Sequence, residues 1–383
     1  MKQRLYQILD VGISLESDSQ ELLDLFETDY SWFKTEFFTA TKTLSVLARL
    51  RDNRFPASLM INGEETLHHE HPNPCKWAYR SILERLMGAF ADCLILHAAV
   101  VAKDGEALII AGPPGAGKTT LVVELLKRGF TYFSDDFCPI HQKKGLVYPF
   151  PRSLWQSLPH PSSTASSHGK EGMSPKKNKA PLSVHSLESA PGDAPCRARV
   201  LLCLGNGNRV RPCYDLEIGM KAGGEDTVVR EFLELPGVTA SLRNPQYCEW
   251  RISIPEKAGV GKQVMEILNK HSSHIWNVYR VDRLDFDFLG SPTASPLKIH
   301  EAAFRVIRDM KQGSLLDTRT GCFSKSPGIL FTEVAHSLEG IACFQLSPGP
   351  LKLMEELVVK IWETHNPSWL FLNHEEHEEH EDK

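Results

Sequence analysis

The spacing of hydrophobic and polar residues in the first part of the chain predicts a small α+β domain. The stretch RLYQILDVGISLES has strand character, and SQELLDLFETDY has the spacing of a short amphipathic helix capped by Asp18 or Ser19. TLSVLARLRDNRFPASLMINGEET predicts strands with a tight turn at Asn62-Gly63. We assign these elements to an amino-terminal domain over residues 1–72.

A second pattern begins at Pro74 and predicts helices alternating with buried strands. CKWAYRSILERLMGAFADC repeats large apolar residues on one helical face, and CLILHAAVVA and EALIIAG predict two strands joined at the turn KDGE. TTLVVELLKR then predicts a helix that ends near Gly129, followed by the strand FTYFSDDF. Strand, turn, helix and strand in such a short stretch are typical of a βαβ-like unit, in which helices cover the sheet.

The remaining sequence predicts a mixed α/β fold with an insertion. Residues 156–195 are rich in Ser, Pro, Gly and Lys, which predicts a flexible segment, and CRARVLLCLG resumes the core as a strand. EWRISIP, KQVMEILNKH, WNVYRVDRLDFDF and PLKIHEAAFRVIRDM predict a further α+β module. We therefore expect a core over residues 73–210, an α+β insertion over 211–330, a closing strand and helix over 331–368 and a disordered tail over 369–383.

Composition and charge narrow the class of protein. The 383 residues are 42% hydrophobic and 24% charged, which is ordinary for a globular chain of more than one domain. The net charge of −5 gives no basic surface for nucleic acid or an anionic membrane. Nine cysteines without a CxxC pair suit free thiols, and no apolar run is long enough to span a membrane. We expect a soluble cytoplasmic protein, and a homo-oligomer stays open.

The strongest chemical motif is the glycine-rich turn GPPGAGKT, which fits the phosphate-loop pattern GxxxxGK[ST]. A predicted strand precedes it and a predicted helix follows, so backbone amides and the positive end of the helix dipole would face a phosphate. Lys118 would reach the β- and γ-phosphates, and the hydroxyl of Thr119 would bind Mg²⁺. The residues predicted to bind ATP are Gly112, Pro113, Pro114, Gly115, Ala116, Gly117, Lys118, Thr119 and Thr120.

Two adjacent carboxylates, Asp135 and Asp136, lie at the end of the next predicted strand, and Asp135 is seventeen residues after Lys118. Phosphoryl transfer to a hydroxyl needs a metal ligand and a group that accepts the proton of the nucleophile, and two carboxylates can supply both. Neighbouring residues of a strand point to opposite faces, so both side chains reach one site only if the strand ends there. The alternative is a solvated Asp-Asp turn.

Two further side chains are weaker candidates. His97 lies within LILHAAVV and is either a core histidine or a titratable group beside the acidic pair. Arg152 follows the site in the chain and either holds a phosphate or acceptor or lies in a surface loop. The runs His68-His69-Glu70-His71 and Lys176-Lys177-Asn178-Lys179, and the histidines of the tail, are interpreted as exposed and solvated.

Taken together, LHAAVVAKDGEALIIAGPPGAGKTTLVVELLKRGFTYFSDD resembles the catalytic core of the HPr kinase/phosphorylase family. It looks most similar to the HPr-kinase-related branch of bacterial peptide-modification clusters, which includes lasso-peptide precursor kinases. The resemblance implies an HPr-kinase/PEP-carboxykinase-like P-loop core with ATP and Mg²⁺ as cofactors. It also implies that Asp135 is the catalytic base beside His97, and we assign Asp136 to the metal side together with Thr119. The later family signature, which supports the phosphorylase reaction, is not visible here.

These observations favour a kinase that transfers the γ-phosphate of ATP to a serine-type hydroxyl of a peptide, protein or small metabolite. The 211–330 segment is where we expect acceptor selection, because it does not match the family. Two alternatives stay open: a nucleotide-binding regulatory module with little transfer activity, and a P-loop ATPase. A motor ATPase would carry its acidic strand further along the chain, and a GTPase would carry an NKxD motif. Neither feature is apparent in the sequence, which argues against both classes.

Overall fold

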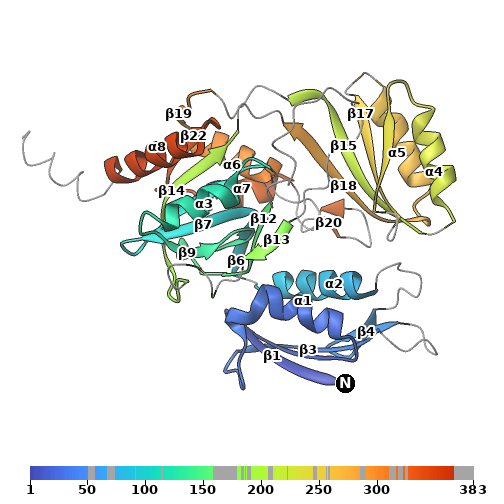
Figure 1. Ribbon diagram of the computed structural model, residues 1–383, viewed down its shortest axis with the longest axis horizontal. Helices are drawn as coiled ribbons and strands as arrows, with labels where there is room; N and C mark the ends of the chain where they lie inside the picture. The colour runs from blue at the N-terminus through green and yellow to red at the C-terminus, as the bar shows by residue number, and fades with distance from the viewer. Residues whose placement is uncertain are drawn as a thin grey trace, which may run out of the picture.

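The computed structural model shows a mixed α/β protein with several sheets (Figure 1). It describes residues 1–50, 57–66, 74–90, 92–113, 115–157, 179–182, 185, 187, 191–205, 210–221, 223–244, 248–255, 257, 259–284, 290–309, 316–317, 322–323 and 327–365. None of the helices in these ranges is long and apolar enough to cross a membrane.

The amino-terminal part is a five-stranded sheet covered on one face by two helices (Figure 1). The strands follow one another in chain order, and the pair β2 and β3 is parallel because α1 crosses between them. The elements are β1 (Lys2–Ile8), β2 (Val11–Ser17), α1 (Gln20–Tyr30), η1 (Ser31–Phe33), β3 (Lys42–Arg49), β4 (Ser58–Ile61), β5 (Glu64–Thr66) and α2 (Pro74–Ala89).

Local sequence signals explain several of these boundaries. Ser19 caps α1, as predicted, by accepting a hydrogen bond from the backbone amide of Leu22 at 3.4 Å. Asn62 and Gly63 have φ angles of 52° and 79°, and they form the predicted tight turn between β4 and β5. Positive φ at both central residues matches the twist of a hairpin, which is why Asn-Gly is a strong turn signal.

The largest sheet has nine strands and forms the core. Its main order is β6-β10-β11-β14-β8-β7-β9, with β22 beside β14 and β19 beside β22. The strands are β6 (Cys93–Leu96), β7 (Ala98–Lys103), β8 (Glu106–Ala111), β9 (Thr131–Ser134), β10 (Cys138–His141), β11 (Leu146–Val147), β14 (Cys196–Leu204), β19 (Ala294–Pro296) and β22 (Ala342–Leu346). The predicted βαβ-like unit is present with one difference: β7 lies between β8 and β9 and pairs with both in antiparallel fashion.

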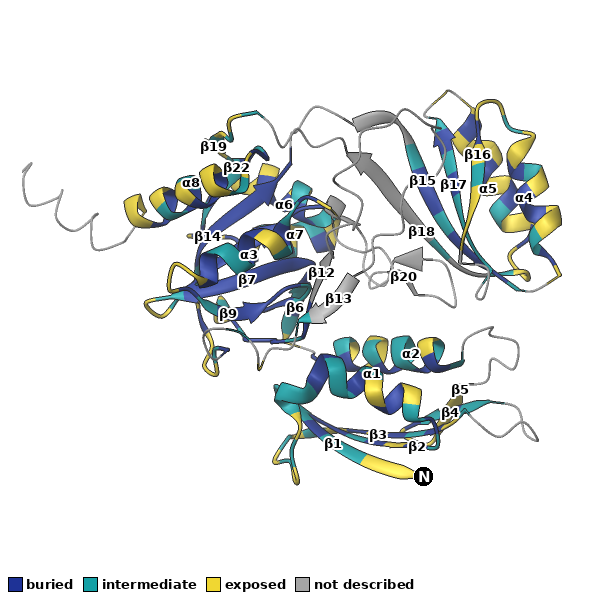
Figure 2. Cartoon of the chain, in the orientation of Figure 1, coloured by how far each residue is buried: buried dark blue, intermediate teal, exposed yellow. Residues whose placement is uncertain are grey.

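Helices cover both faces of this sheet, which explains the continuous apolar runs in its central strands (Figure 2). On one face lie α3 (Lys118–Leu126) and α8 (Leu351–Thr364), and on the other lie α6 (Ile299–Asp309) and α7 (Pro327–Ser337). In β7, Ala99 and Val101 pack toward α3, while Val100 packs toward α6 and α7. The helix α6 packs on the core sheet although it falls in the range predicted as an insertion, whereas most of α7 falls in the segment predicted to close the core.

A separate four-stranded sheet lies between the two parts of the core in the sequence. Its order is β16-β17-β15-β18, and two amphipathic helices cover one face. The elements are β15 (Val210–Met220), α4 (Glu225–Leu233), β16 (Thr239–Asn244), β17 (Glu249–Pro255), α5 (Val260–Lys270) and β18 (Ile275–Leu284). The strand β15 had no counterpart in the sequence prediction, whereas α5, with Gly259 as its N-cap, contains the predicted segment KQVMEILNKH.

Most of the segments predicted as flexible lie outside the described residues. Within 156–195, the described part includes β13 (Lys179–Leu182), which pairs with β12 (Leu154–Ser157). A second small pair is formed by β20 (Leu316–Asp317) and β21 (Cys322–Phe323). Residues 68–71, 176–178 and the predicted tail 369–383 are not among the described residues.

Candidate functional site

The glycine loop connects the end of β8 to the start of α3, as the sequence predicts. Gly115 and Gly117 have φ angles of 87° and 93°, a region that side chains with a Cβ disfavour, and Gly117 is the N-cap of α3. A Cβ on Gly112 would lie 2.9 Å from the Cβ of Leu204 on the neighbouring strand β14. Glycine is therefore required here for backbone shape and for packing. Pro114 lies outside the described residues.

Lys118 is the first residue of α3, and its side chain folds back over the loop. The lysine is only 8% exposed, and its Nζ donates to the carbonyl oxygens of Gly112 at 2.6 Å and Pro113 at 3.4 Å. The ammonium group thus lies on the loop whose amides would face a phosphate. Of the other predicted loop residues, Ala116 is buried, whereas Gly115 and Thr120 are exposed.

Thr119 and Asp135 contact each other directly. The Oγ1 of Thr119 donates to the Oδ2 of Asp135 at 3.0 Å, and Asp135 is 7% exposed. The strand β9 ends at Ser134, whose Oγ accepts a hydrogen bond from the amide of Phe137 at 3.1 Å. This local turn ends the strand, and so the condition for both carboxylates to reach one site is met.

His97 lies beside the acidic pair because the break between β6 and β7, which contains His97, is opposite the break between β9 and β10, which contains the two aspartates. The sequence predicts one continuous strand through His97, but this is wrong: β6 ends at Leu96 and pairs with β10, while β7 begins at Ala98 and pairs with β9. The turn between β9 and β10 contains the two aspartates. His97 is 8% exposed, and its Nδ1 lies 3.0 Å from the carbonyl oxygen of Asp136 and 4.0 Å from its Oδ1.

Arg152 approaches Asp136 from another direction. Its Nη1 lies 3.8 Å from the Oδ2 of Asp136, and its side chain is 12% exposed, so the surface-loop interpretation is wrong. The Nη2 donates to the carboxylate of Asp29 and, at 2.8 Å, to the hydroxyl of Tyr79. The guanidinium also lies over the ring of Tyr30, 5.3 Å from its centroid, and 5.2 Å from that of Phe137.

Three of these partners, Asp29, Tyr30 and Tyr79, come from α1 and α2, and sequence reasoning missed them. Nothing in the local sequence singles out an aspartate in the last turn of an amphipathic helix. Burial by itself would lower the pKa of Arg152, but Tyr30, Tyr79, Asp29 and Asp136 raise it well above its usual value. The arginine therefore keeps its positive charge in this buried position.

The chemistry of the side chains suits a hard divalent cation. Thr119 and Asp135 offer neutral and anionic oxygens next to the phosphate loop, and Asp136 offers a third, half-exposed group. Mg²⁺ is normally held by one or two carboxylates together with substrate phosphates and water, not by a complete protein cage. No group of three or more His, Cys, Asp or Glu side chains arranged for a metal occurs within the described ranges.

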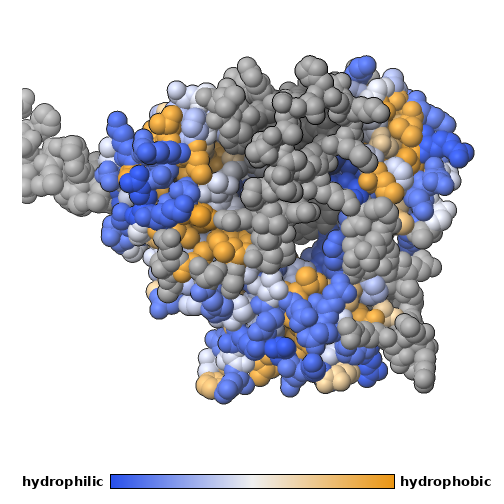
Figure 3. Space-filling view, viewed as in Figure 1, coloured by the Kyte–Doolittle hydropathy of each residue, from blue (hydrophilic) through white to orange (hydrophobic). Residues whose placement is uncertain are grey.

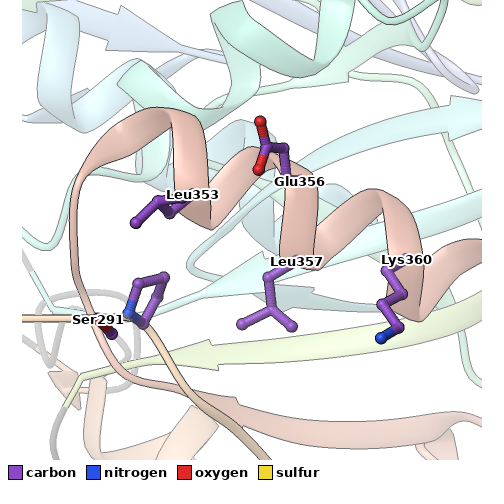
Figure 4. A pocket seen from close by; sticks show the side chains of 6 residues that line it. Ser291, Leu353, Glu356, Leu357 and Lys360 are labelled. Atoms are coloured by element: carbon purple, nitrogen blue, oxygen red, sulfur yellow. The ribbon is translucent and has the colours of Figure 1, made fainter.

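A second surface feature lies on α8 and is separate from this site. It is a pocket lined by Ser291, Pro292, Leu353, Glu356, Leu357 and Lys360 (Figure 4). The outward face of α8 is mainly hydrophilic (Figure 3). The lining includes none of the residues named above around Lys118, Thr119 and the two aspartates.

Comparisons with known proteins give little beyond this geometry. No protein-family model matches the chain, and neither does any curated protein. Among solved structures, the chain is similar to the Hpr(Ser) kinase/phosphatase from Coxiella burnetii, with 14% sequence identity and a TM-score of 0.20. The match covers 47% of this chain and 97% of that chain. At this identity and TM-score the similarity carries no argument about activity, and the proposal below rests on the residues of this chain.

Proposed function

We propose that this protein is an ATP- and Mg²⁺-dependent kinase that phosphorylates a serine-type hydroxyl. The observation that carries the proposal is the hydrogen bond from Thr119 of the phosphate loop to Asp135 at the end of β9, with Asp136 and His97 adjacent. A P-loop threonine, two carboxylates and a histidine in one cluster provide more than a phosphate cradle needs. They provide groups for both metal binding and proton transfer.

The loop and Lys118 would bind and orient the triphosphate of ATP. The amides of residues 115–119 and the amino terminus of α3 would stabilise the phosphate oxygens. Lys118 would leave the carbonyls of Gly112 and Pro113, which it now contacts, and neutralise charge on the β- and γ-phosphates. Thr119 and Asp135 would hold Mg²⁺, which when bound would supply neutralisation of phosphate charge.

The contacts favour a division of roles between the two aspartates opposite to the one that the family resemblance implies. Asp135 accepts a hydrogen bond from Thr119, the hydroxyl that such loops place on the metal, and we therefore assign Asp135 to the metal side. Asp136 is more exposed, with 36% of its side chain accessible, and lies between His97 and Arg152. We assign Asp136 as the base that takes the proton of the acceptor hydroxyl. The oxygen of that hydroxyl forms the new bond to the γ-phosphorus as the bond from the γ-phosphorus to ADP breaks and ADP leaves.

The acceptor is a hydroxyl of a peptide, a protein or a small metabolite, and the four-stranded sheet of residues 210–284 is the proposed acceptor-selection module. A regulatory nucleotide-binding module is the second candidate. One observation favours it: both Lys118 and Thr119 are engaged in contacts within the site, and a protein that never released them would bind nucleotide without transferring phosphate.

The test uses γ-labelled ATP, Mg²⁺ and candidate acceptors, including free serine and serine-containing peptides, with the full-length protein. We expect transfer that falls about 10²- to 10⁴-fold when the base is changed to Asn. The variants Asp135→Asn and Asp136→Asn separate the roles, because the base variant should lose rate at saturating Mg²⁺ whereas the metal variant should need more Mg²⁺. Nucleotide binding without transfer to any acceptor would favour the regulatory module.

A further inference from the structure

A buried network connects the amino-terminal part of the protein to Asp136 of the candidate site. Arg152 is at its centre, with its Nη2 bonded to Asp29 and Tyr79 and its Nη1 facing Asp136. Tyr79 also donates to the carboxylate of Asp29, so the three side chains hold one another. Side-chain exposure is 12% for Arg152 and 8% for Asp29.

Arg152 lies closer to the carboxylate of Asp29 than to the carboxylate of Asp136. Arg152 bonds Asp29 directly but lies 3.8 Å from the Oδ2 of Asp136, which is too far for a strong hydrogen bond. Its backbone is also fixed, because its carbonyl oxygen accepts a hydrogen bond from the hydroxyl of Tyr132 at 2.8 Å. The next residue, Ser153, donates to the carbonyl oxygen of Thr28. The arginine is thus held on the side of the amino-terminal helices.

A guanidinium that paired fully with Asp136 would occupy the carboxylate oxygens that the proposed base needs. Arginine forms two parallel bonds to a carboxylate when the geometry allows, and such pairs are among the strongest in proteins. At its present distance of 3.8 Å, Arg152 can orient Asp136 by charge without itself forming a paired bond to the carboxylate. The carboxylate of Asp29 and the hydroxyl of Tyr79 both accept from the Nη2 of the same guanidinium and so compete with Asp136 for it.

We propose that Arg152 is a positioning residue for Asp136 and that Asp29 and Tyr79 restrain it from closing on that carboxylate. The amino-terminal helices α1 and α2 are then part of the site, although no residue of theirs touches the phosphate loop in the described contacts. The inference rests on the proposed function for its catalytic meaning, but the restraint itself is a property of the protein alone.

The experiment measures the coupling between Arg152 and Asp136 by a double-mutant cycle in urea unfolding. The cycle uses Arg152→Gln, Asp136→Asn and the double variant, first in the natural chain and then with Asp29→Asn. If Asp29 holds the arginine back, its neutral isostere should let Arg152 pair with Asp136. We express the coupling between Arg152 and Asp136 as a ratio of unfolding constants, and we expect this ratio to be about tenfold larger with Asp29→Asn than in the natural chain. An equal coupling in both chains would overturn the proposal.

A matched control uses another buried arginine of the core. Arg199 donates from Nη1 to Glu106 at 3.0 Å and lies over the ring of Trp362, but it contacts neither aspartate of the site in the described contacts. The cycle of Arg199 and Glu106 should be the same with and without Asp29→Asn. Where Arg152→Gln does not fold, Arg152→Lys keeps the charge but not the paired geometry, and serves in its place.

Transfer assays separate this inference from the proposed function. If the natural chain transfers phosphate, Asp29→Asn should slow the transfer by about 100-fold without changing the KM for the nucleotide. Adding Arg152→Gln to the Asp29→Asn variant should restore part of the rate. If the natural chain transfers phosphate to no acceptor, the proposed function fails while the unfolding cycle still decides whether the restraint exists. Transfer that is unaffected by Asp29→Asn would overturn the positioning role.

Discussion

The hydrogen bond between Thr119 and Asp135 gives the sharpest prediction about stability. Thr119→Val replaces the hydroxyl with a methyl group of nearly the same shape and keeps a β-branched residue near the start of α3. The 7% exposed carboxylate of Asp135 then loses a donor 3.0 Å away. Hydrogen bonds to charged groups contribute about 1.5–3 kcal/mol. Since Thr119 is half-buried, we expect a loss near 1.5 kcal/mol, which raises the unfolding constant roughly tenfold.

The assay is urea unfolding of the full-length protein without nucleotide or Mg²⁺, so that only the contact within the protein is measured. Thr119→Ser is the matched control: it keeps the hydroxyl and should retain the bond. A double-mutant cycle with Asp135→Asn isolates the pair from other effects of either change. If Thr119→Val is as stable as the natural chain, or if the cycle shows no coupling, the contact contributes nothing and the metal-side assignment of Asp135 loses its support.

Three further predictions concern two glycines with positive φ, a buried arginine and a buried thiol. Gly115→Ala and Gly145→Ala both force a Cβ onto positive φ, at 87° and 62°, with no neighbour within 4 Å, so each should cost about 1–2 kcal/mol in urea unfolding. Only the first should weaken binding of a fluorescent ATP analogue, and equal binding in both variants would contradict the loop assignment. Arg199→Met removes bonds to Glu106 and to the carbonyl of His365, and should lower stability by about 3–5 kcal/mol without changing nucleotide binding in the same two assays. Burial raises the pKa of the Cys343 thiol from 9.0 to about 11, so between these pH values the folded protein keeps a proton that the unfolded chain loses. The free energy of unfolding should therefore be at its full value below pH 9 and decline toward pH 11. In urea unfolding at a series of pH values, Cys343→Ala should show a shallower decline over that range.

The candidate site was predictable where chemistry is local in the sequence. The loop, Lys118 and Thr119 come from one continuous motif. The predicted strand FTYFSDDF is present, but β9 ends earlier than predicted, at Ser134, in a turn made by neighbouring residues. The sequence also limited the cap of α1 to Asp18 or Ser19, of which Ser19 is the cap, and predicted the turn at Asn62-Gly63, because each depends on a few adjacent residues. The placement of His97 was not predictable in this way, since its position depends on a break that two paired strands share.

The same reasoning explains the errors. The sequence offered two interpretations of Arg152, and its burial depends on Asp29 and Tyr79, which are 123 and 73 residues away in the chain. The helix α6 was predicted as part of an insertion, yet its apolar face completes the core against the nine-stranded sheet. Amphipathic spacing shows that a helix has a buried face, but it does not identify the surface that buries it.

By itself, the sequence determined the phosphate loop, the adjacent carboxylates and most of the elements that carry them. Motifs, caps and turns act over a few residues, where covalent spacing fixes what can meet. Tertiary structure alone decided that Thr119 bonds Asp135, that His97 and Arg152 approach Asp136 from different strands and loops, and that α1 and α2 supply the partners of that arginine. These contacts join residues far apart in the chain, and only the pairing of strands and the packing of helices brings them within hydrogen-bonding or electrostatic range.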